Sequence, residues 1–343
     1  MTKRVLLTGH NGYLGSRMGP MLQDAGYEVS GVDTGYFAEC TLPGGERSVP
    51  GIRKDIRDLE AKDLEGFDAV IHLAALSNDP IGNLNNDWTA QINYRGSVNL
   101  AKLAKQAGVE RFMFSSSCIM YGLSQAKLCN EDSPLAPQTE YARSKVRAEE
   151  EIRALADKSF SPIFMRNGTV YGISPRMRID TVLNDLVATA MTTGKVTVQG
   201  DGTPWRPVVH VEDLCRSFIH VLGAPREKIH NQAFNNGNEK LNHQIIDLAR
   251  IVSETVPETT VEVLGSEAVD KRTYKADFTK FATTFPEFSF NWTPKTGAAE
   301  LYEGYKAVGF RLEDLKGPRY VRLRWLRRLL DEARLDSNLR WTH

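Results

Sequence analysis

Short apolar runs alternate with stretches of helical period through the first third of the chain. The runs predict buried strands at residues 5–7, 28–32, 69–73 and 111–114. Between them, helical spacing predicts helices at 13–25 and 88–107, the second followed by Gly108 as a C-cap. Strands that alternate with helices indicate βαβ units with parallel strands. We therefore expect an α/β fold, a Rossmann-type doubly wound parallel sheet.

The pattern continues to about residue 172 and then becomes less regular. A loop is expected at 34–50, a helix from 138 or 139 to 155, and a strand at 162–165. Later helical patterns fall at 179–191, 211–222 and 243–252, with short strands near 196–198, 233–235 and 261–264. We expect residues 1–172 to form mainly a core domain and residues 173–315 mainly a smaller substrate-binding domain. The chain is free to cross between the two.

The tail, residues 316–343, has a pattern of its own. Apolar residues fall at helical spacing from 321 to 330, and most of the arginines lie on the opposite face, although Arg322 interrupts the apolar one. A basic amphipathic helix can bind a membrane surface, an acidic partner or nucleic acid. We favour a terminal helix that docks its apolar stripe on the body or on a second subunit, because surface helices usually have such a stripe.

Charge changes this picture only locally. Lys plus Arg is 43 and Asp plus Glu is 43, which excludes a globally basic nucleic-acid binder. The tail holds 8 of the basic residues and 3 of the acidic ones, so the body up to residue 315 holds 35 and 40. Anionic ligands of the body must therefore be captured by local groups, since the overall charge gives no help.

Cysteine use and hydropathy point to the compartment. The 4 cysteines form no CxxC pair, no apolar run approaches the length of a membrane span, and the 7 histidines show no metal-ligand spacing. His72 stands in an apolar run, where a hydrogen-bonded core histidine is the usual interpretation. We expect a cytoplasmic protein without a membrane span or a metal site.

The strongest chemical signal is the segment from Thr8 to Gly15, which follows a strand and opens a helix. Glycines there permit a tight turn and let the backbone approach a pyrophosphate, which the helix N-terminus then binds. Asp33 lies 18 residues after Gly15, at the end of the second strand. An aspartate there accepts hydrogen bonds from an adenosine ribose and repels a 2′-phosphate, which favours NAD over NADP. The alternative is a glycine-rich turn without a ligand.

A second signal is the pair Tyr141 and Lys145. On a helix, positions i and i+4 share a face, so the ammonium would lie beside the phenol and lower the pKa of the tyrosine. The alternative is a solvated surface pair. The serines 115–117 strengthen the first interpretation, because they follow an apolar run and would lie at the ligand-facing edge of a parallel sheet. Asp55, taken alone, is best interpreted as a helix N-cap.

Together these residues resemble the extended short-chain dehydrogenase/reductase family, and more narrowly its NAD-dependent nucleotide-sugar epimerase/dehydratase branch. The resemblance extends from about Lys3 to Glu313. Its later part lies in the segments 166–172, 200–206 and 208–213.

The resemblance implies roles for individual residues. The catalytic residues would be Ser117, Tyr141 and Lys145, with Tyr141 as general base and acid. The expected NAD-binding residues are Gly9, Asn11, Gly12, Tyr13, Leu14, Gly15, Asp33, Asp55, Ile56, Leu73, Ala74, Ala75, Asn93, Ser115, Tyr141 and Lys145. The expected substrate-binding residues are Ser117, Cys118, Thr169, Asn184 and Arg206, and Arg206 would pair with the nucleotide diphosphate. A surface amide is nearly as good an interpretation of Asn184.

Departures from the branch narrow the reaction. The 4,6-dehydratase members carry Asp-Glu directly after the hydroxyl residue, where this chain has Cys118 and Ile119. Isoleucine has no proton to move, and a small buried residue is the favoured interpretation of Cys118. Thr169 stands where many members have an asparagine, and Pro207 where an aspartate commonly follows the arginine.

We therefore expect an NAD-dependent nucleotide-sugar epimerase that acts by transient oxidation to a ketosugar and re-reduction. The alternatives are a dehydratase or a ketosugar reductase of the same branch and, more distantly, a non-catalytic dinucleotide-binding scaffold. The resemblance also implies a homodimer formed through the helices at 88–107 and 139–155.

Overall fold

A sheet of seven parallel strands lies at the centre of the described part of the chain. The computed structural model describes residues 3–44, 47–77, 79–123, 127–265 and 272–342. The strand order is β10-β6-β5-β4-β1-β2-β3, and each neighbouring pair is parallel. The strands are β1 (Arg4–Thr8), β2 (Glu28–Asp33), β3 (Gly51–Arg53), β4 (Ala69–His72), β5 (Arg111–Ser117), β6 (Ser161–Asn167) and β10 (Gln232–Asn236). The predicted α/β class is confirmed.

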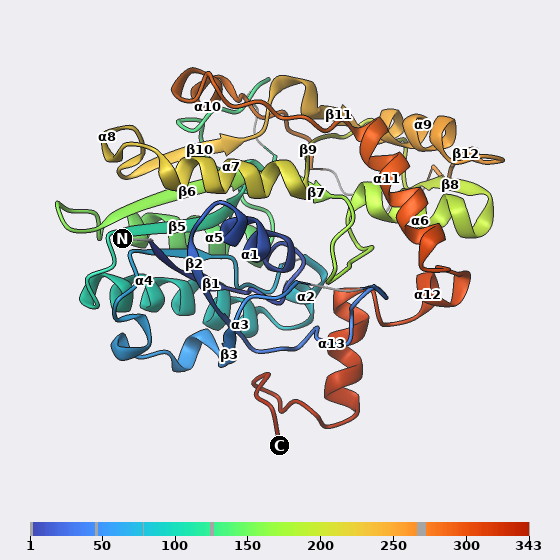
Figure 1. The fold of residues 1–343 in the computed structure, drawn as a ribbon. Helices are drawn as coiled ribbons and strands as arrows, with labels where there is room; N and C mark the ends of the chain where they lie inside the picture. Colours follow the sequence, from blue (N-terminus) through green and yellow to red (C-terminus); the bar gives the residue numbers. More distant parts are fainter. Residues whose placement is uncertain (1–2, 45–46, 78, 124–126, 266–271, 343) are drawn as a thin grey trace.

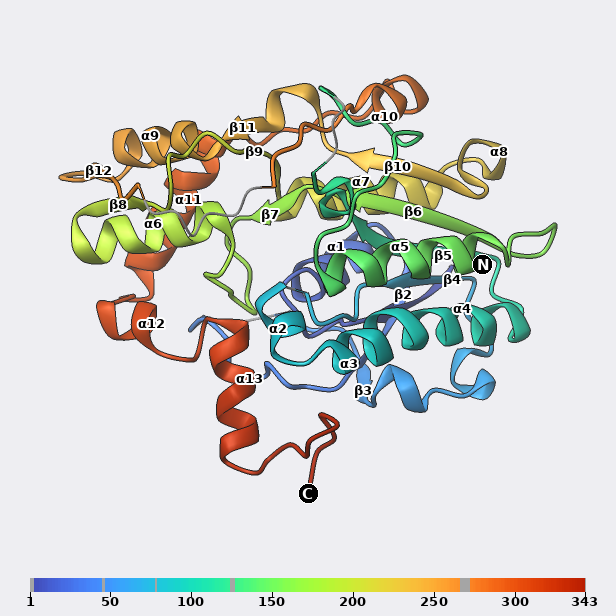
Figure 2. The same ribbon diagram turned by 180° about the vertical axis from the view of Figure 1, so that it is seen from behind.

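Successive side chains of the central strands belong to two separate apolar cores, one on each face of the sheet. Leu7 and Met113 face the helices α1 (Gly15–Asp24) and α7 (Val211–Gly223), whereas Leu6 and Phe112 belong to the core under α4 (Ser97–Gln106) and α5 (Glu140–Arg153). Successive side chains of a strand point to opposite faces, so a strand buried on both faces must be apolar throughout. Figure 1 shows α1 and α7 in front of the sheet, and Figure 2 shows α4 and α5 on the other side.

The second part of the chain builds a smaller unit beside one end of the sheet (Figure 1). It contains a sheet of β7, β9 and β11 and a parallel pair of β8 and β12. The chain leaves this unit to add α7 and β10 to the central layers and then returns. The strands are β7 (Thr169–Tyr171), β8 (Lys195–Val198), β9 (Trp205–His210), β11 (Asn242–Gln244) and β12 (Thr260–Val263).

Most predicted elements are present with small shifts of their ends. The helix expected at 88–107 runs through a π-helical segment (Ala90–Gly96), and Gly108 follows its end with φ +81°. The helix α11 was not predicted, although Thr293 caps it and Pro294 is its first residue. The remaining helices are α2 (Asp79–Leu84), α3 (Asn86–Thr89), α6 (Val182–Thr193), α8 (Arg226–Ile229), α9 (Ile245–Thr255), α10 (Thr279–Thr284), α11 (Pro294–Ala307), α12 (Leu312–Lys316) and α13 (Arg322–Asp331).

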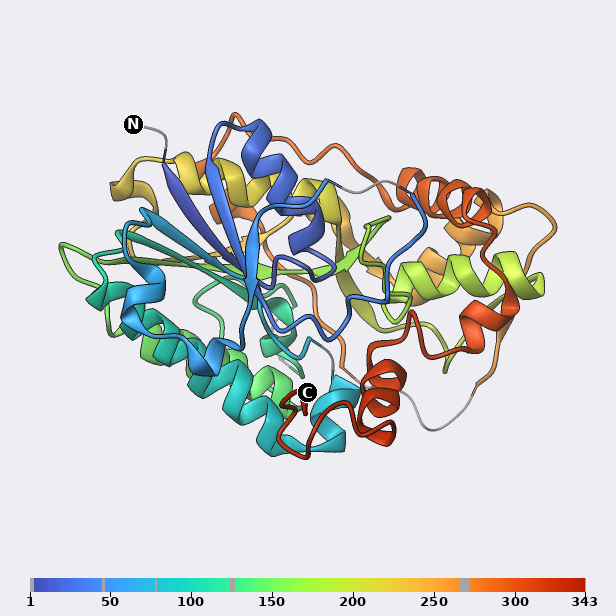
Figure 3. The ribbon, with the colours of Figure 1, turned by 60° about the horizontal axis from the view of Figure 1, so that its bottom comes forward.

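The last helix, α13, and the residues after it lie along the edge of the central unit beside α2 (Figure 3). Leu326 and Leu329 belong to the same apolar cluster as Leu6 and Val32 of the central sheet. The polar residues that follow the helix include Arg340, which forms an ion pair with Asp58. The apolar stripe of the tail is therefore buried within its own chain.

His72, at the end of β4, is a core histidine as expected. Its Nδ1 is 2.7 Å from Thr8 Oγ1 and its Nε2 is 2.8 Å from Ser97 Oγ, and the residue is 1% exposed. Burial, aided by the charge of Lys145, lowers the pKa of His72 to about 3. The imidazole is therefore neutral in the folded protein and joins β1, β4 and α4 through its two ring nitrogens.

The buried neutral imidazole predicts acid sensitivity. The unfolded chain takes up this proton below the ordinary value of 6.5, whereas the folded protein takes it up only near pH 3, so stability falls as pH falls between these values. His72→Gln, which cannot titrate, should lose about 2 kcal/mol less unfolding free energy than the unchanged protein between about pH 7 and pH 5. Urea unfolding at both pH values measures this difference, and equal losses in the two proteins would contradict it.

Candidate active site

The carboxyl ends of β1, β2, β4 and β5 open into a cavity of about 570 Å³. In a parallel sheet these ends meet at one edge, so loops that are far apart in the sequence come together there. The cavity continues past the central sheet to β8 and β9 of the smaller unit. The predicted residues that line it are Gly9, Gly12, Tyr13, Leu14, Gly15, Asp33, Asp55, Ile56, Leu73, Ala74, Ala75, Ser115, Ser117, Tyr141, Lys145, Thr169 and Arg206.

The turn between β1 and α1 needs glycine for steric reasons. Gly9 has φ +75°, and a Cβ on it would lie 2.8 Å from the backbone nitrogen of Ala74. A Cβ on Gly15 would lie only 2.1 Å from the carbonyl oxygen of Gly9. Within the described residues, the backbone N–H groups of Tyr13 and Leu14 donate to no protein acceptor. The start of α1 therefore offers donors to an anion in the cavity.

Asp33 is held in place at the end of β2. Its carboxylate accepts hydrogen bonds from the backbone N–H groups of Asn11, at 3.1 Å, and Gly35, at 2.7 Å. These bonds fix the carboxylate beside the glycine turn and leave it partly exposed in the cavity. The position fits an acceptor for a ribose diol.

Asp55 has two functions in the structure. It is the N-cap of a 3₁₀ helix (Ile56–Asp58), since its side chain accepts a hydrogen bond from the Arg57 N–H, and this confirms the capping interpretation. It also lines the cavity, where its carboxylate pairs with Arg57 at 2.6 Å and Arg340 at 3.1 Å. Ile56 is buried next to it and offers an apolar surface to a ligand.

The serines of β5 line the same cavity as Tyr141 and Lys145. Thr139 caps α5 by accepting a hydrogen bond from the Ala142 N–H, which places Tyr141 in the first turn of the helix. The Lys145 ammonium donates to the Ser115 carbonyl at 2.7 Å and lies 5.9 Å from the centroid of the Tyr141 ring. Ser117 Oγ accepts from the Ile119 N–H.

Lys145 is buried, being 4% exposed. Burial lowers the pKa of its ammonium to about 7, so the group can gain or lose a proton near neutral pH. Near neutral pH, both the charged and the neutral form of Lys145 are therefore populated. A negative charge that develops on the neighbouring phenol would favour the charged ammonium. The helix thus supplies Tyr141 with a cation that responds to the charge of the phenol.

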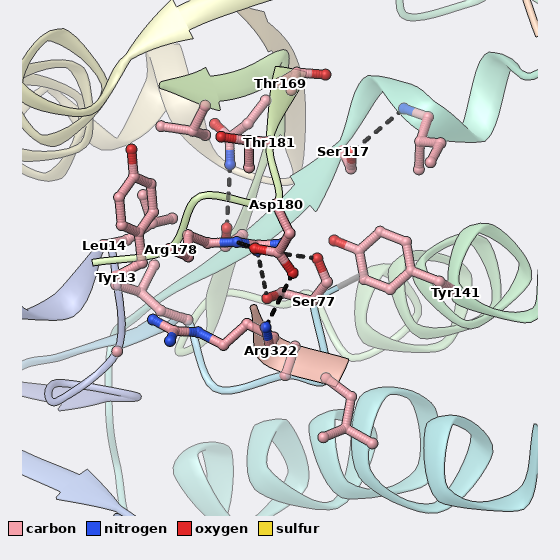
Figure 4. Close-up of a pocket in the computed structure, with 18 of the residues that line it drawn as sticks. Tyr13, Leu14, Ser77, Ser117, Tyr141, Thr169, Arg178, Asp180, Thr181 and Arg322 are labelled. Carbon is pink, nitrogen blue, oxygen red and sulfur yellow. Dashed lines mark hydrogen bonds and ion pairs between the residues drawn. The ribbon is translucent and has the colours of Figure 1, made fainter. Parts of the chain in front are cut away.

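A charged cluster next to Tyr141 was not predicted from the sequence. Arg178 donates to the Ser77 hydroxyl at 2.9 Å and pairs with Asp180 at 2.7 Å, and Figure 4 shows Ser77 and Arg178 beside the Tyr141 ring. The Arg178 guanidinium holds the pKa of Asp180 below its usual range although burial opposes this. Arg322 of the tail completes the cluster.

The far end of the cavity is formed by the smaller unit. Arg206 on β9 lies with its guanidinium carbon 5.5 Å from the ring centroid of Tyr274 and donates to the carbonyls of Trp205 and Arg272. Thr169 on β7 lines the same space. The aromatic ring and the guanidinium offer a stacking surface and a cation to a ligand that reaches this end.

The side chains of Asn93, Cys118 and Asn184 are not brought to the cavity. Asn93 bonds both backbone groups of Leu76 and so fixes the loop after β4. Cys118 is fully buried with its thiol 3.1 Å from the Arg166 carbonyl oxygen, and Asn184 accepts from the Gly172 N–H. These contacts fix backbone segments near the cavity.

Asn11 contributes through its backbone, because its N–H donates to Asp33 while its amide nitrogen lies 2.9 Å from His10 Nε2.

Asp185 is a second feature of the cavity that was not predicted from the sequence. It lines the cavity, where burial raises its pKa to about 6.

Other kinds of site are not found among the described residues. The four cysteines are free and buried, and no group of His, Cys, Asp or Glu in this part of the chain is arranged to hold a metal ion. No helix in the described ranges is long and apolar enough to cross a membrane.

Comparisons with known proteins agree with this geometry. Residues 5–237 match the model of the NAD dependent epimerase/dehydratase family. UDP-glucose 4-epimerase 2 of Arabidopsis thaliana is 27% identical over 337 residues, which cover 88% of this chain and 93% of the relative. The dTDP-D-glucose 4,6-dehydratase of Mus musculus is 26% identical over 326 residues, 89% of each protein. The structure of MoeE5 in complex with UDP-glucuronic acid and NAD aligns with a TM-score of 0.76 at 26% identity, covering 89% of this chain and 99% of MoeE5.

The glycine turn generates a testable prediction. Gly15→Ala should weaken NAD binding at least about tenfold, because the new Cβ forces α1 away from the Gly9 carbonyl oxygen and displaces the donors at its start. Gly223→Ala is the matched control, since its Cβ would meet nothing closer than 3.7 Å. Calorimetric titration with NAD, on samples checked for folding by circular dichroism, measures the effect. Equal affinities in the two variants would refute the prediction.

Proposed function

The chain belongs to the NAD-dependent epimerase/dehydratase family, and on that premise we propose that it interconverts two epimers of a nucleotide sugar. The observation that carries this proposal is the composition of the cavity wall around Tyr141. Ser117, Lys145 and Ile119 share that wall with the phenol. This set can move one proton at a sugar hydroxyl, and Ile119 stands where a second acid or base would be needed to expel water.

The cofactor is NAD. Its diphosphate fits the start of α1, where Gly9 and Gly15 leave no room for side chains and the N–H groups of Tyr13 and Leu14 have no acceptor among the described residues. Asp33 is the acceptor for the adenosine ribose, and Ile56 forms an apolar wall for the adenine. When bound, NAD supplies an acceptor and donor of hydride.

Tyr141 acts as general base and then as general acid. Its phenolate takes the proton from a sugar hydroxyl while that carbon is oxidised, and the phenol returns the proton when the resulting ketosugar is reduced on its other face. Lys145 stabilises the phenolate, and Ser117 donates a hydrogen bond to the reacting oxygen.

The substrate is a nucleotide sugar whose diphosphate binds Arg206. The guanidinium suits phosphate oxygens, and it lies at the end of the cavity opposite to the start of α1. The ring of Tyr274 beside it gives the base a surface on which to stack. Thr169, on the strand β7 that pairs with β9, lines the same cavity and can contact the sugar.

A dehydratase of the same family is the second candidate, because a relative of comparable identity is a dTDP-D-glucose 4,6-dehydratase. Ile119 disfavours it, because this side chain offers no acid or base next to Ser117. Asp180, the carboxylate of the cluster beside Tyr141, is paired with Arg178 and held ionised. A ketosugar reductase would need the same three residues as the epimerase. A non-catalytic scaffold would need no phenol beside a buried ammonium.

Assembly and location stay predictions. The expected homodimer would pair the helical layer of α4 and α5 with its copy. The expected cytoplasmic location agrees with four cysteines that are all free.

The proposed reaction makes no net NADH. Incubating the purified protein and NAD with UDP-, dTDP- and GDP-linked hexoses should yield an epimer of one of them, detected by NMR, while absorbance at about 340 nm stays constant because the hydride is returned. An unsaturated or deoxy-keto product would establish a dehydratase instead, and stoichiometric NADH a dehydrogenase.

Removing the phenolic oxygen should act on turnover. Tyr141→Phe should lower kcat by a factor of at least about 100, the usual range for a lost general base, and change the Kd of the nucleotide sugar by less than about threefold. Tyr94→Phe is the control, since that phenol contacts Glu151 between two helices outside the cavity. Turnover preserved in Tyr141→Phe would remove Tyr141 from the mechanism.

A further inference from the structure

The residues 321–342, here called the C-terminal segment, lie against a loop that lines the cavity, and Arg322 of the segment lines the cavity itself. Trp325 donates from its indole nitrogen to the Tyr36 carbonyl at 2.7 Å, and Trp341 does the same to the Thr34 carbonyl at 2.7 Å. Thr34 and Tyr36 belong to the loop that follows Asp33, and both line the cavity. The segment therefore fixes the loop that borders the adenosine side of the site.

Further contacts hold the segment in this place. Trp88 donates to the Ser337 carbonyl at 2.8 Å, and Arg57 donates to the Asn338 carbonyl at 3.0 Å. Arg340 pairs with Asp55, which itself lines the cavity. This segment lies outside residues 5–237, the part of the chain that matches the family model.

Arg322, at the start of α13, is the residue of the segment whose side chain lines the cavity. It is 3% exposed. Its Nη2 donates to the Arg176 carbonyl at 2.9 Å, and its guanidinium lies 4.4 Å from the centroid of the Phe37 ring. Its Nη1 is buried and has no hydrogen-bond partner among the described residues.

The surroundings of Arg322 do not balance its charge. Asp180 is already paired with Arg178, and the backbone N–H of Arg322 donates to its carboxylate. Arg176 and Arg178 add positive charge nearby, and burial keeps the Cys40 thiol neutral by raising its pKa to about 11. Burial also lowers the pKa of Arg322 to about 10, which still leaves it charged at neutral pH. A buried cation with an unused donor is costly unless an anion joins it.

The position of the Arg322 side chain indicates which anion it would bind. Figure 4 shows the Arg322 side chain extending away from Tyr141 and toward Tyr13 and Leu14 of the glycine turn. Arg176, which binds Arg322 through its carbonyl, also donates from Nε to the Asn11 carbonyl of that turn at 3.0 Å. The substrate phosphates belong to Arg206 at the other end of the cavity. The group expected beside the start of α1 is the diphosphate of the dinucleotide.

We propose that Arg322 binds the diphosphate of NAD and that the C-terminal segment is a part of the cofactor site which slows the release of NAD. The guanidinium adds a cation to the N–H donors at the start of α1, and Phe37 and the Arg176 carbonyl orient it. The inference rests on the proposed position of the cofactor and is independent of the reaction carried out on the sugar.

The test is a comparison of ligands with and without the diphosphate. Arg322→Gln should weaken NAD and ADP-ribose about ten- to a hundredfold, the usual effect of losing a charged hydrogen bond, and should speed the release of NAD measured by stopped flow. Adenosine, which has no phosphate, should bind both proteins equally. Arg322→Lys should recover part of the affinity for NAD, and Arg327→Gln, an exposed charge change on the same helix, should behave as the unchanged protein.

Two results would overturn the proposal. Unchanged affinity for NAD in Arg322→Gln would show that the guanidinium does not touch the cofactor. Equal losses for NAD and adenosine would assign Arg322 to the packing of the segment alone. Because no sugar is present, both results are distinct from a failure of the epimerase proposal, which would leave NAD binding intact.

Discussion

The contact between Gly15 and the Gly9 carbonyl oxygen is the constraint on which the site depends. It brings α1 so close to the end of β1 that no Cβ fits between them. The start of the helix then points into the cavity, at the level where β2 presents Asp33 and β5 presents its serines. If this turn were wider, the N–H donors of α1 and the carboxylate of Asp33 would lie too far apart to bind the same dinucleotide. The rest of the fold supplies walls around this arrangement.

The fold was predictable because its signals are local. Strands such as β1 and β5 are buried on both faces, and this makes them continuous apolar runs that stand out against helices with one apolar stripe. The irregular second half has shorter strands and weaker periods. Even there the start of α11 has a recognisable local signal, because Thr293 caps the helix and Pro294 is its first residue.

The candidate site was predictable where motif residues lie next to a strand end or share one face of a helix, as Tyr141 and Lys145 do. Asp33 and Ser117 are such residues, and both line the cavity. Asn93 and Asn184 lie in helical segments, and their amides form hydrogen bonds with backbone groups, which no sequence spacing reveals. Arg178 and Arg322 come from segments 144 residues apart in the sequence and share Asp180. Such an association depends on the tertiary fold, and periodicity does not encode it.

One weak signal for Arg322 was nevertheless present in the sequence. A charged residue on the apolar face of an amphipathic helix costs stability unless a partner compensates it, and Arg322 interrupts the stripe formed by Trp325, Leu326 and Leu329. The nearby Asp180 side chain is already paired with Arg178. The anionic ligand of the site can supply what the protein does not. An arginine on the apolar face of a terminal helix therefore indicates that a charged ligand binds next to that helix. The net charge of the whole chain, which is zero, gives no sign of such a residue.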